Sequence, residues 1–181
     1  MPKFDIPTLF TTVKSEIEFL LQILQYMPSD WTCKIMSFSI GEDITFEEQR
    51  WKRKCLNSAG SRGIYIFVEK ESGEILYVGK TSDSFQKRVG QHFSGNVNVS
   101  RIKRYFYEKK YPSNKKIFDE KGNDNKNCSY QDKAQFNSEY SNFLSKYRVL
   151  CLCIDFLGSH EQFLLELENK IRQFLKPIIL A

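Results

Sequence analysis

Two short β-rich runs joined by a polar bridge restrict the fold of this chain more than any other feature of its sequence. The runs cover residues 63–68 and 75–80, and the bridge between them, residues 69–74, contains Gly73. A bridge this short, with a glycine in it, joins strands that run in opposite directions. The sequence therefore predicts an antiparallel hairpin near the middle of the chain.

Hydrophobic periodicity predicts the elements on either side of the hairpin. We expect helices over residues 8–27, 45–56, 84–93, 99–110, 132–146 and 160–175, and strands over residues 33–40 and 148–157. Asp83 followed by Gln86 fits a capping box at the start of the helix over 84–93. Together these elements predict an α+β fold, with a small antiparallel sheet of about three strands flanked by helices.

The distribution of charge indicates how the chain is organised. The first fifty residues lean acidic, whereas basic residues predominate from Arg50 onward. We expect a mostly helical N-terminal extension over residues 1–60 and a core over residues 61–181. A basic insertion in that core, at about residues 94–147, contains a loop rich in Gly, Asn, Asp and Lys over residues 119–129.

The overall composition is that of a globular protein with a moderately basic character. Hydrophobic residues make up 41% of the chain and charged residues 27%, and the formal net charge is +5. This charge is compatible with a polyanionic partner without proving one. The five cysteines contain no C-x-x-C pair, and no signal-peptide pattern or membrane-length apolar run is present. We therefore expect free thiols, a cytoplasmic location and no membrane partner.

Basic residues gather in two places where DNA could bind. One group precedes the hairpin and the other begins the insertion, where aromatic residues lie among the bases; the residues are Lys52, Arg53, Lys54, Arg101, Lys103, Arg104 and Tyr105. Basic side chains neutralise phosphates, and aromatic rings among them can stack on bases. The alternative is a solvated basic surface over an aromatic core, and charge alone slightly favours it.

Strand alternation and helical spacing bring several polar side chains together. Tyr65 and Tyr77 are expected on one face of the hairpin, and Gly79 on that face permits a close approach of the backbone. Arg88 and His92 are four residues apart and project from one side of the next helix. The hairpin residues expected to point the other way, into a core, are Ile64, Ile66, Leu76 and Val78.

A glutamate on the last helix is a candidate cation ligand. Glu168 lies at the margin of the apolar stripe that contains Leu164 and Ile171, so its carboxylate can reach inward. The ordinary alternative is a boundary glutamate that pairs with a lysine. Glu161 and Glu166 are competing candidates, and spacing favours Glu168 over both.

The other residues have ordinary interpretations as well. Tyr65 and Tyr77 taken alone are most often plain strand tyrosines, and Arg88 and His92 taken alone a solvated helix face. Residues 79–81, Gly-Lys-Thr, superficially suggest a phosphate-binding loop, but the nearest upstream glycine is one residue too far away for that motif. The combination of the four residues, in this order and spacing, favours a catalytic site.

The order of these motifs resembles a known family. Residues 63–65 read GIY and residues 77–79 read YVG; a helical arginine with a histidine four residues later follows, and then a glutamate nine residues before Pro177. This series resembles the GIY-YIG nucleases, which include homing endonucleases, the incision domain of the excision-repair nuclease and several restriction enzymes. The resemblance covers roughly residues 62–181 and implies hydrolysis of phosphodiester bonds in DNA.

The resemblance also implies a role for each matching residue. Tyr65 corresponds to the general base or water-positioning phenol, and Tyr77 to its hydrogen-bonding partner. Arg88 corresponds to the group that stabilises transition-state charge, and His92 to one that tunes Tyr65 or relays its proton. Lys80 follows the second motif, where a cation lowers the pKa of a tyrosine below its ordinary value of ~10.

On the C-terminal side the match is partial. Glu168 corresponds to the ligand of one Mg²⁺ or Mn²⁺ that acts as a Lewis acid on the phosphate. Family members commonly carry an asparagine about three residues after the proline, where this chain has Leu180. Another polar residue then has that role, or the site is weakened.

Several functions are consistent with the resemblance. A short chain with elements before and inside the core resembles compact restriction enzymes, which need no separate DNA-binding domain. A repair, structure-specific or mobile-element nuclease stays open, as does a non-cleaving DNA-binding protein built on a decayed core. One core holds one active site, so a palindromic double-strand cut requires a homodimer or sequential nicking.

Overall fold

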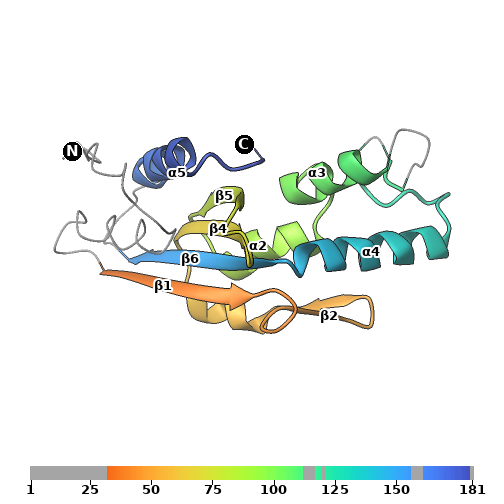
Figure 1. The fold of residues 1–181 in the computed structure, drawn as a ribbon, viewed down its shortest axis with the longest axis horizontal. Helices are drawn as coiled ribbons and strands as arrows, with labels where there is room; N and C mark the ends of the chain where they lie inside the picture. Colours follow the sequence, from red (N-terminus) through yellow and green to blue (C-terminus); the bar gives the residue numbers. More distant parts are fainter. Residues whose placement is uncertain (1–31, 112–116, 120, 156–160, 180–181) are drawn as a thin grey trace.

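The fold of this chain is α+β, as predicted. The structure, a computed structural model, describes residues 32–111, 117–119, 121–155 and 161–179. The helix predicted over residues 8–27 lies outside the described residues, as does Leu180. A four-stranded antiparallel sheet with the order β1-β6-β4-β5 forms the centre of the molecule, with helices around it (Figure 1).

The predicted hairpin is confirmed. Strands β4 (Gly63–Glu69) and β5 (Ile75–Thr81) pair with Tyr65 opposite Gly79 and Phe67 opposite Tyr77. A register shift after Phe67 moves Leu76 into the core on the tyrosine side of the sheet, so the prediction for that residue was wrong. The other three residues expected opposite the tyrosines lie there, in the second core; they are Ile64, Ile66 and Val78.

The sheet has four strands rather than three. Strand β6 (Tyr147–Asp155) pairs with β4 on one side and with β1 (Thr32–Ser39) on the other. Both faces of β6 are largely apolar and buried, so both of its edges need a partner strand inside the molecule. The described part of the N-terminal segment therefore contributes β1 to the central sheet.

The helix predicted over residues 45–56 is wrong. This segment forms two short antiparallel strands, β2 (Thr45–Glu47) and β3 (Arg50–Lys52), followed by a 3₁₀ helix, η2 (Lys54–Ala59). The ring of Trp51 lies 5.1 Å from that of Phe46 across the hairpin and 4.7 Å from that of Phe93. This cross-strand and tertiary aromatic packing overrides the helical spacing of the sequence.

Helices cover both faces of the sheet. On the tyrosine side, α2 (Phe85–Ser94), α3 (Arg101–Lys110) and α4 (Tyr130–Leu144) pack around a large aromatic core that includes Phe67 and Phe136. On the opposite side, α5 (Glu161–Leu175) packs a stripe of Leu164, Leu167 and Ile171 against β4, β5 and β6. The sheet thus separates two cores, and β4 contributes to both.

Polar groups and caps complete these elements. Ser84, rather than the predicted Asp83, caps α2 by accepting from the Lys87 N–H, while Thr81 Oγ1 accepts from the N–H groups of Asp83 and Ser84.

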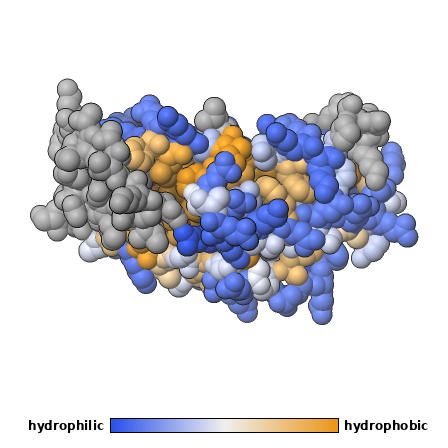
Figure 2. Space-filling model, in the orientation of Figure 1, coloured by the Kyte–Doolittle hydropathy of each residue, from blue (hydrophilic) through white to orange (hydrophobic). Residues whose placement is uncertain are grey.

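The five cysteines are free thiols, as predicted. In the described part of the chain, no helix has the length and apolar character needed to cross a membrane. Hydrophilic side chains predominate over α4 in Figure 2, whereas apolar ones show between α5 and β5.

The first glycine of the hairpin generates a stability prediction. Gly63 has a φ of +143°, and a Cβ there would lie 1.9 Å from the Leu152 carbonyl oxygen in the paired strand. Gly63→Ala is expected to lower the free energy of unfolding by about 3 kcal/mol or more, because the paired strands must move apart. Urea denaturation followed by circular dichroism measures this change.

Gly60→Ala is the matched control. Gly60 also has a positive φ, +80°, but a Cβ there would meet nothing within 4 Å. Its cost is expected to be smaller, about 1–3 kcal/mol, because only the backbone strain of an L residue at a φ of +80° and a ψ of −160° is involved, without a clash. Equal destabilisation by the two substitutions would contradict a steric role for Gly63 in the strand pairing.

Candidate active site

A hydrogen bond between two buried side chains forms the centre of the candidate site. The Tyr65 Oη lies 3.0 Å from His92 Nε2, and both residues are almost fully buried. The ring of Tyr77 lies 6.1 Å from that of Tyr65 and 5.0 Å from that of His92. Strand β4 supplies one tyrosine, β5 the other and α2 the histidine, so the convergence predicted from strand and helix periodicity is confirmed.

Burial sets the protonation state of both partners. It raises the pKa of Tyr65 above its ordinary value, an effect that Tyr77 reinforces and Arg88 opposes. Burial, with the nearby Arg88 guanidinium, lowers the pKa of His92 to about 3. At neutral pH the phenol is therefore protonated and the imidazole is neutral. The cation that favours the Tyr65 phenolate is Arg88, and Lys80 is directed elsewhere.

Gly79 makes room for the Tyr65 phenol. It lies directly opposite Tyr65 in the hairpin, and a Cβ at Gly79 would lie 2.4 Å from the Tyr65 Oη. Any other residue would push the phenol away from His92. The glycine of the second motif is thus explained by the close approach of the Tyr65 side chain.

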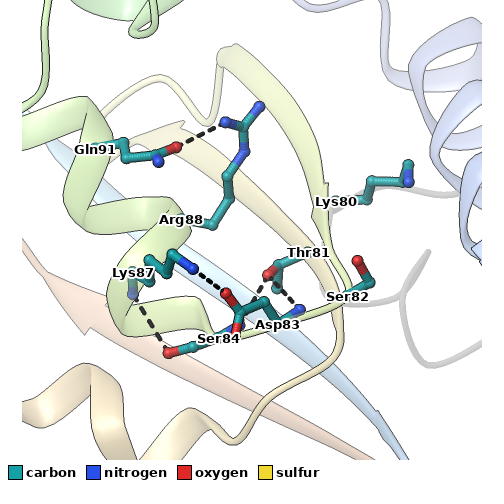
Figure 3. A pocket seen from close by; sticks show the side chains of 8 residues that line it. All are labelled: Lys80, Thr81, Ser82, Asp83, Ser84, Lys87, Arg88 and Gln91. Carbon is teal, nitrogen blue, oxygen red and sulfur yellow. Dashed lines mark hydrogen bonds and ion pairs between the residues drawn. The ribbon is translucent and has the colours of Figure 1, made fainter.

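Arg88 belongs to an open, polar hollow of net positive charge beside the buried pair. Its Nη1 donates to Gln91 Oε1 at 2.7 Å, and both side chains project from α2 (Figure 3). The hollow has a volume of about 320 Å³, and the residues that line it are Lys80, Thr81, Ser82, Asp83, Ser84, Lys87, Arg88 and Gln91. Cationic groups and hydroxyls around the first turn of a helix suit an anionic group such as a phosphate.

Glu168 approaches strand β5 from the opposite side of the sheet. It is only 6% exposed, and its Oε1 accepts from Arg172 Nη2 at 2.7 Å. Burial raises the pKa of Glu168, and the charges of Arg172, Lys80 and Arg88 oppose that rise. The backbone N–H of Lys80 also donates to the carboxylate. Glu168 is therefore a buried carboxylate at the end of β5.

Arg172 is a member of this group that the sequence reasoning missed. Its Nε and Nη2 donate to the Val78 carbonyl at 3.2 and 3.0 Å, and its guanidinium lies 5.9 Å from the Tyr77 ring centre. The arginine holds Glu168 against β5 and is itself only 18% exposed. Its position four residues after Glu168, on the same helix face, was the available signal.

The competing carboxylates lie at the surface. Lys80 Nζ pairs with Glu161 Oε1 at 3.2 Å, and the Glu161 side chain is 68% exposed. Glu166 is exposed and accepts from Gln162 at 3.1 Å. Of these three glutamates, Glu168 is the one with a buried carboxylate beside the tyrosine pair.

The residues present fit a divalent cation held by a single carboxylate. Within the described ranges, no group of three or more His, Cys, Asp or Glu side chains gathers to form an all-protein cage. Mg²⁺ commonly keeps several waters and takes one or two carboxylates together with substrate phosphates. Glu168 accepts from Arg172 and from the Lys80 N–H, and the lone pairs that these two bonds leave on its oxygens are the donors that fit such a site.

Four of the residues predicted to bind DNA are exposed and the others are partly or fully buried. Lys52 and Lys54 are exposed around η2, while Arg53 packs its Nε against Gly90 of α2. Arg101 and Arg104 are exposed on α3, and the half-buried Tyr105 ring lies 5.6 Å from Lys109 Nζ.

Lys103 is a correction to the predicted DNA-binding set. It is only 7% exposed, its Nζ donates to the Gly95 carbonyl at 3.0 Å, and burial lowers its pKa to about 8. The ammonium also lies 5.7 Å from the centre of the Tyr140 ring. Lys103 therefore has a packing position and does not extend from the surface with its neighbours.

The sheet has a phenol–imidazole pair on one side and a carboxylate on the other. Residues 61–177 match the model of the GIY-YIG catalytic domain. The chain belongs to the GIY-YIG family, and it is therefore a nuclease, a hydrolase of phosphodiester bonds. No curated protein and no solved structure matches the chain.

The low pKa of His92 generates a prediction about stability and pH. The folded pKa, about 3, is below the ordinary value of 6.5, so the folded state binds fewer protons than the unfolded state between these values. Stability due to the neutral His92 is present above pH 6.5 and is lost as the pH falls toward 3. We expect the free energy of unfolding to fall by about 1.4 kcal/mol per pH unit in this window.

The contribution of His92 is isolated by comparison with His92→Gln. Other groups, including Glu168, titrate equally in both proteins, so the difference between the two unfolding free energies reports on His92. This difference should shrink steadily between pH 6 and pH 4 in urea titrations. A difference that stays constant over that range would contradict a buried neutral imidazole.

Proposed function

We propose that this nuclease is a metal-dependent endonuclease that cleaves DNA at specific sequences, as a restriction enzyme does. One observation supports this proposal above the others: the 3.0 Å contact between Tyr65 and His92, flanked by Arg88 on one side and Glu168 on the other. These four residues surround the end of β5, where a phosphodiester would meet both a proton-accepting pair and cationic groups.

The proposed reaction is in-line attack of water on the phosphorus atom. A water proton passes to the Tyr65 oxygen as the phenol proton passes to His92 Nε2, and the resulting hydroxide attacks the phosphate. The phosphorus–oxygen bond to the leaving strand then breaks, and the leaving oxygen takes a proton from solvent. Arg88 stabilises the charge that grows on the phosphate, because its guanidinium lies at the hollow where an anion fits.

Glu168 would hold one divalent cation, Mg²⁺ or Mn²⁺, which when bound supplies Lewis-acid stabilisation of the phosphate and leaving oxygen. The chain's own contribution is to keep the Glu168 carboxylate buried and oriented. Arg172 does this by bridging Glu168 to the Val78 carbonyl. Tyr77 packs between Arg172 and His92 and so links the Glu168–Arg172 pair to the Tyr65–His92 pair.

The DNA is proposed to cross α3 as well as the hollow beside Arg88. A groove of about 420 Å³ lies between α3 and the C-terminal residues Ile178 and Ile179, and Arg101, Arg104 and Tyr105 line it. The two arginines supply phosphate contacts, and Lys52 and Lys54 are exposed separately, around η2. A homodimer would place two sites on a palindromic target.

The first experiment on this proposal measures nicking of supercoiled plasmid in Mg²⁺ or Mn²⁺. Arg88→Ala and Glu168→Ala are each expected to lower the rate by about 100-fold or more, because each removes charge stabilisation at the phosphate. Glu166→Ala, an exposed carboxylate on the same helix, is the matched control and should cleave at the wild-type rate. Discrete fragments, rather than a smear, support sequence specificity.

Each result that contradicts the proposal points to a different conclusion. Wild-type protein that nicks no plasmid in either metal contradicts the endonuclease proposal and favours a non-cleaving DNA-binding protein. Equal activity of wild type, Arg88→Ala and Glu168→Ala indicates a contaminating nuclease. Cleavage confined to branched or damaged DNA favours a repair or structure-specific role over restriction.

A second experiment tests the proposed DNA surface. The double variant Arg101→Ala, Arg104→Ala is expected to weaken DNA binding about 10-fold or more at 100 mM salt. It should also reduce the slope of log affinity against log salt concentration by about two, because two phosphate contacts are lost. Lys103→Met is the contrast, since Lys103 is buried and should leave the salt dependence unchanged. Fluorescence anisotropy with a labelled duplex at several salt concentrations measures both quantities.

A further inference from the structure

The second nitrogen of His92 contacts a buried serine of the insertion. Ser100 is fully buried, and its Oγ lies 3.3 Å from His92 Nδ1. The same Oγ accepts from the Lys103 N–H at 3.1 Å and so caps α3. Tyr65, His92 and Ser100 thus form a continuous chain of hydrogen bonds from β4, through α2, to the start of α3.

Two arrangements of protons are compatible with these distances. In the first, Ser100 donates to His92 Nδ1, and His92 Nε2–H donates to the Tyr65 oxygen. In the second, His92 Nδ1–H donates to Ser100, and His92 Nε2 accepts from the Tyr65 hydroxyl. A neutral imidazole carries one proton, so the two arrangements exclude each other.

The hydroxyl of Tyr65 distinguishes between them. Among the residues that the structure describes, the His92 ring is the one acceptor at hydrogen-bonding distance from this phenol, whereas Arg88 interacts with it as a donor. In the first arrangement two donors would face the phenol oxygen, and its own buried proton would have no acceptor among the described residues. A buried donor without a partner is strongly unfavourable, so this geometry favours the second arrangement.

The hydroxyl of Ser100 agrees with the second arrangement. A serine oxygen accepts two hydrogen bonds and donates one. Ser100 would accept from the Lys103 N–H and from His92 Nδ1–H. Its own proton has an acceptor in the His92 carbonyl at 3.4 Å or in the nearby Tyr140 phenol oxygen. Every polar group of the cluster is then satisfied.

We propose that Ser100 is a positioning residue that keeps the His92 proton on Nδ1, so that Nε2 is free to accept the proton of Tyr65. This inference rests on the proposed function for its role in catalysis. The serine would also accept from the imidazolium that forms when the phenol proton moves to His92. The insertion then contributes to the active site, in addition to any contact with DNA.

Apart from Tyr65 and Ser100, the groups around His92 fix the place of its ring without fixing its tautomer. Tyr140 of α4 donates to the His92 carbonyl at 2.6 Å, which anchors the backbone of α2. The charged and titratable groups on the packed elements are Tyr65 and Tyr77 from the hairpin, Arg88 on α2, Lys103 on α3 and Tyr140 on α4. Of these, Tyr65 is the one with a hydrogen bond to the ring.

The direct test reads the tautomer of His92 by ¹⁵N NMR at neutral pH, without DNA. The chain has two histidines, so His160→Gln protein labelled with ¹⁵N-histidine reports on His92 alone. The expected spectrum shows a protonated Nδ1 and an unprotonated Nε2. A protonated Nε2 overturns the proposal whether or not the protein cleaves DNA, so this result is independent of the proposed function.

Variants then separate the role at His92 from the capping of α3. Ser100→Ala is expected to allow protonation at Nε2 and to lower the nicking rate by at least ~10-fold, the lower limit for loss of an orienting hydrogen bond to a histidine. Ser100→Thr keeps the hydroxyl and should restore the Nδ1–H tautomer and part of the rate.

Two control variants each lose one hydrogen bond of a kind found around Ser100, without touching the contact between Ser100 and the His92 ring. Ser129→Ala removes the equivalent cap of α4, where Ser129 accepts from the Asp132 N–H. Tyr140→Phe removes the anchor on the His92 carbonyl. Both should leave the His92 tautomer unchanged. An Nδ1–H tautomer that persists in folded Ser100→Ala overturns the proposal, and if that variant does not fold, the wild-type spectrum decides.

Discussion

Burial of β4 on both faces is the constraint on which the candidate site depends. This strand lies between β5 and β6, and its alternating side chains enter two different cores. Ile64 and Ile66 anchor it against α5, which leaves Tyr65 fixed on the other side toward α2. A one-residue slip would exchange the two faces and place the phenol among the leucines of α5. The tight pairing of Gly63 and Gly79 with their neighbours sets the register that prevents such a slip.

Low solvent exposure makes the site an arrangement of neutral and paired groups. Burial keeps the His92 imidazole neutral and the Tyr65 phenol protonated, so the hydrogen bond between them carries no net charge before substrate binds. Charge is confined to the rim, where Arg88 lines the hollow, and to the Glu168–Arg172 pair behind β5. A phosphate at this rim would bring negative charge next to Arg88 and next to the neutral Tyr65–His92 pair.

The insertion between α2 and β6 is structurally part of the core. Its helices α3 and α4 pack their aromatic side chains together, with the Phe106 ring 5.7 Å from that of Phe136. From this aromatic cluster Tyr140 reaches the His92 carbonyl, and Ser100 reaches the His92 ring. The packing of the insertion thus limits the movement of the histidine, even though the segment is basic and rich in polar residues at its surface.

Periodicity along the sequence determined the hairpin, the shared face of Tyr65 and Tyr77, and the common side of Arg88 and His92. These relations are local, because strand alternation and helical spacing act over a few residues. The fourth strand, β1, and the β2–β3 hairpin were not determined in this way. Trp51 lies in strand β3, where its ring packs against the ring of Phe93, a residue distant in sequence.

The partners of the site residues were likewise decided by the tertiary structure. Lys103 has the same sequence surroundings as Arg101 and Arg104, yet packing buries it alone. Ser100 faces His92 only because the turn after α2 brings the start of α3 back onto that helix. The sequence by itself therefore determined which candidate residues share a face of a strand or a side of a helix. Only the tertiary structure decided their partners and protonation, because burial and contacts between distant segments are properties of the folded chain.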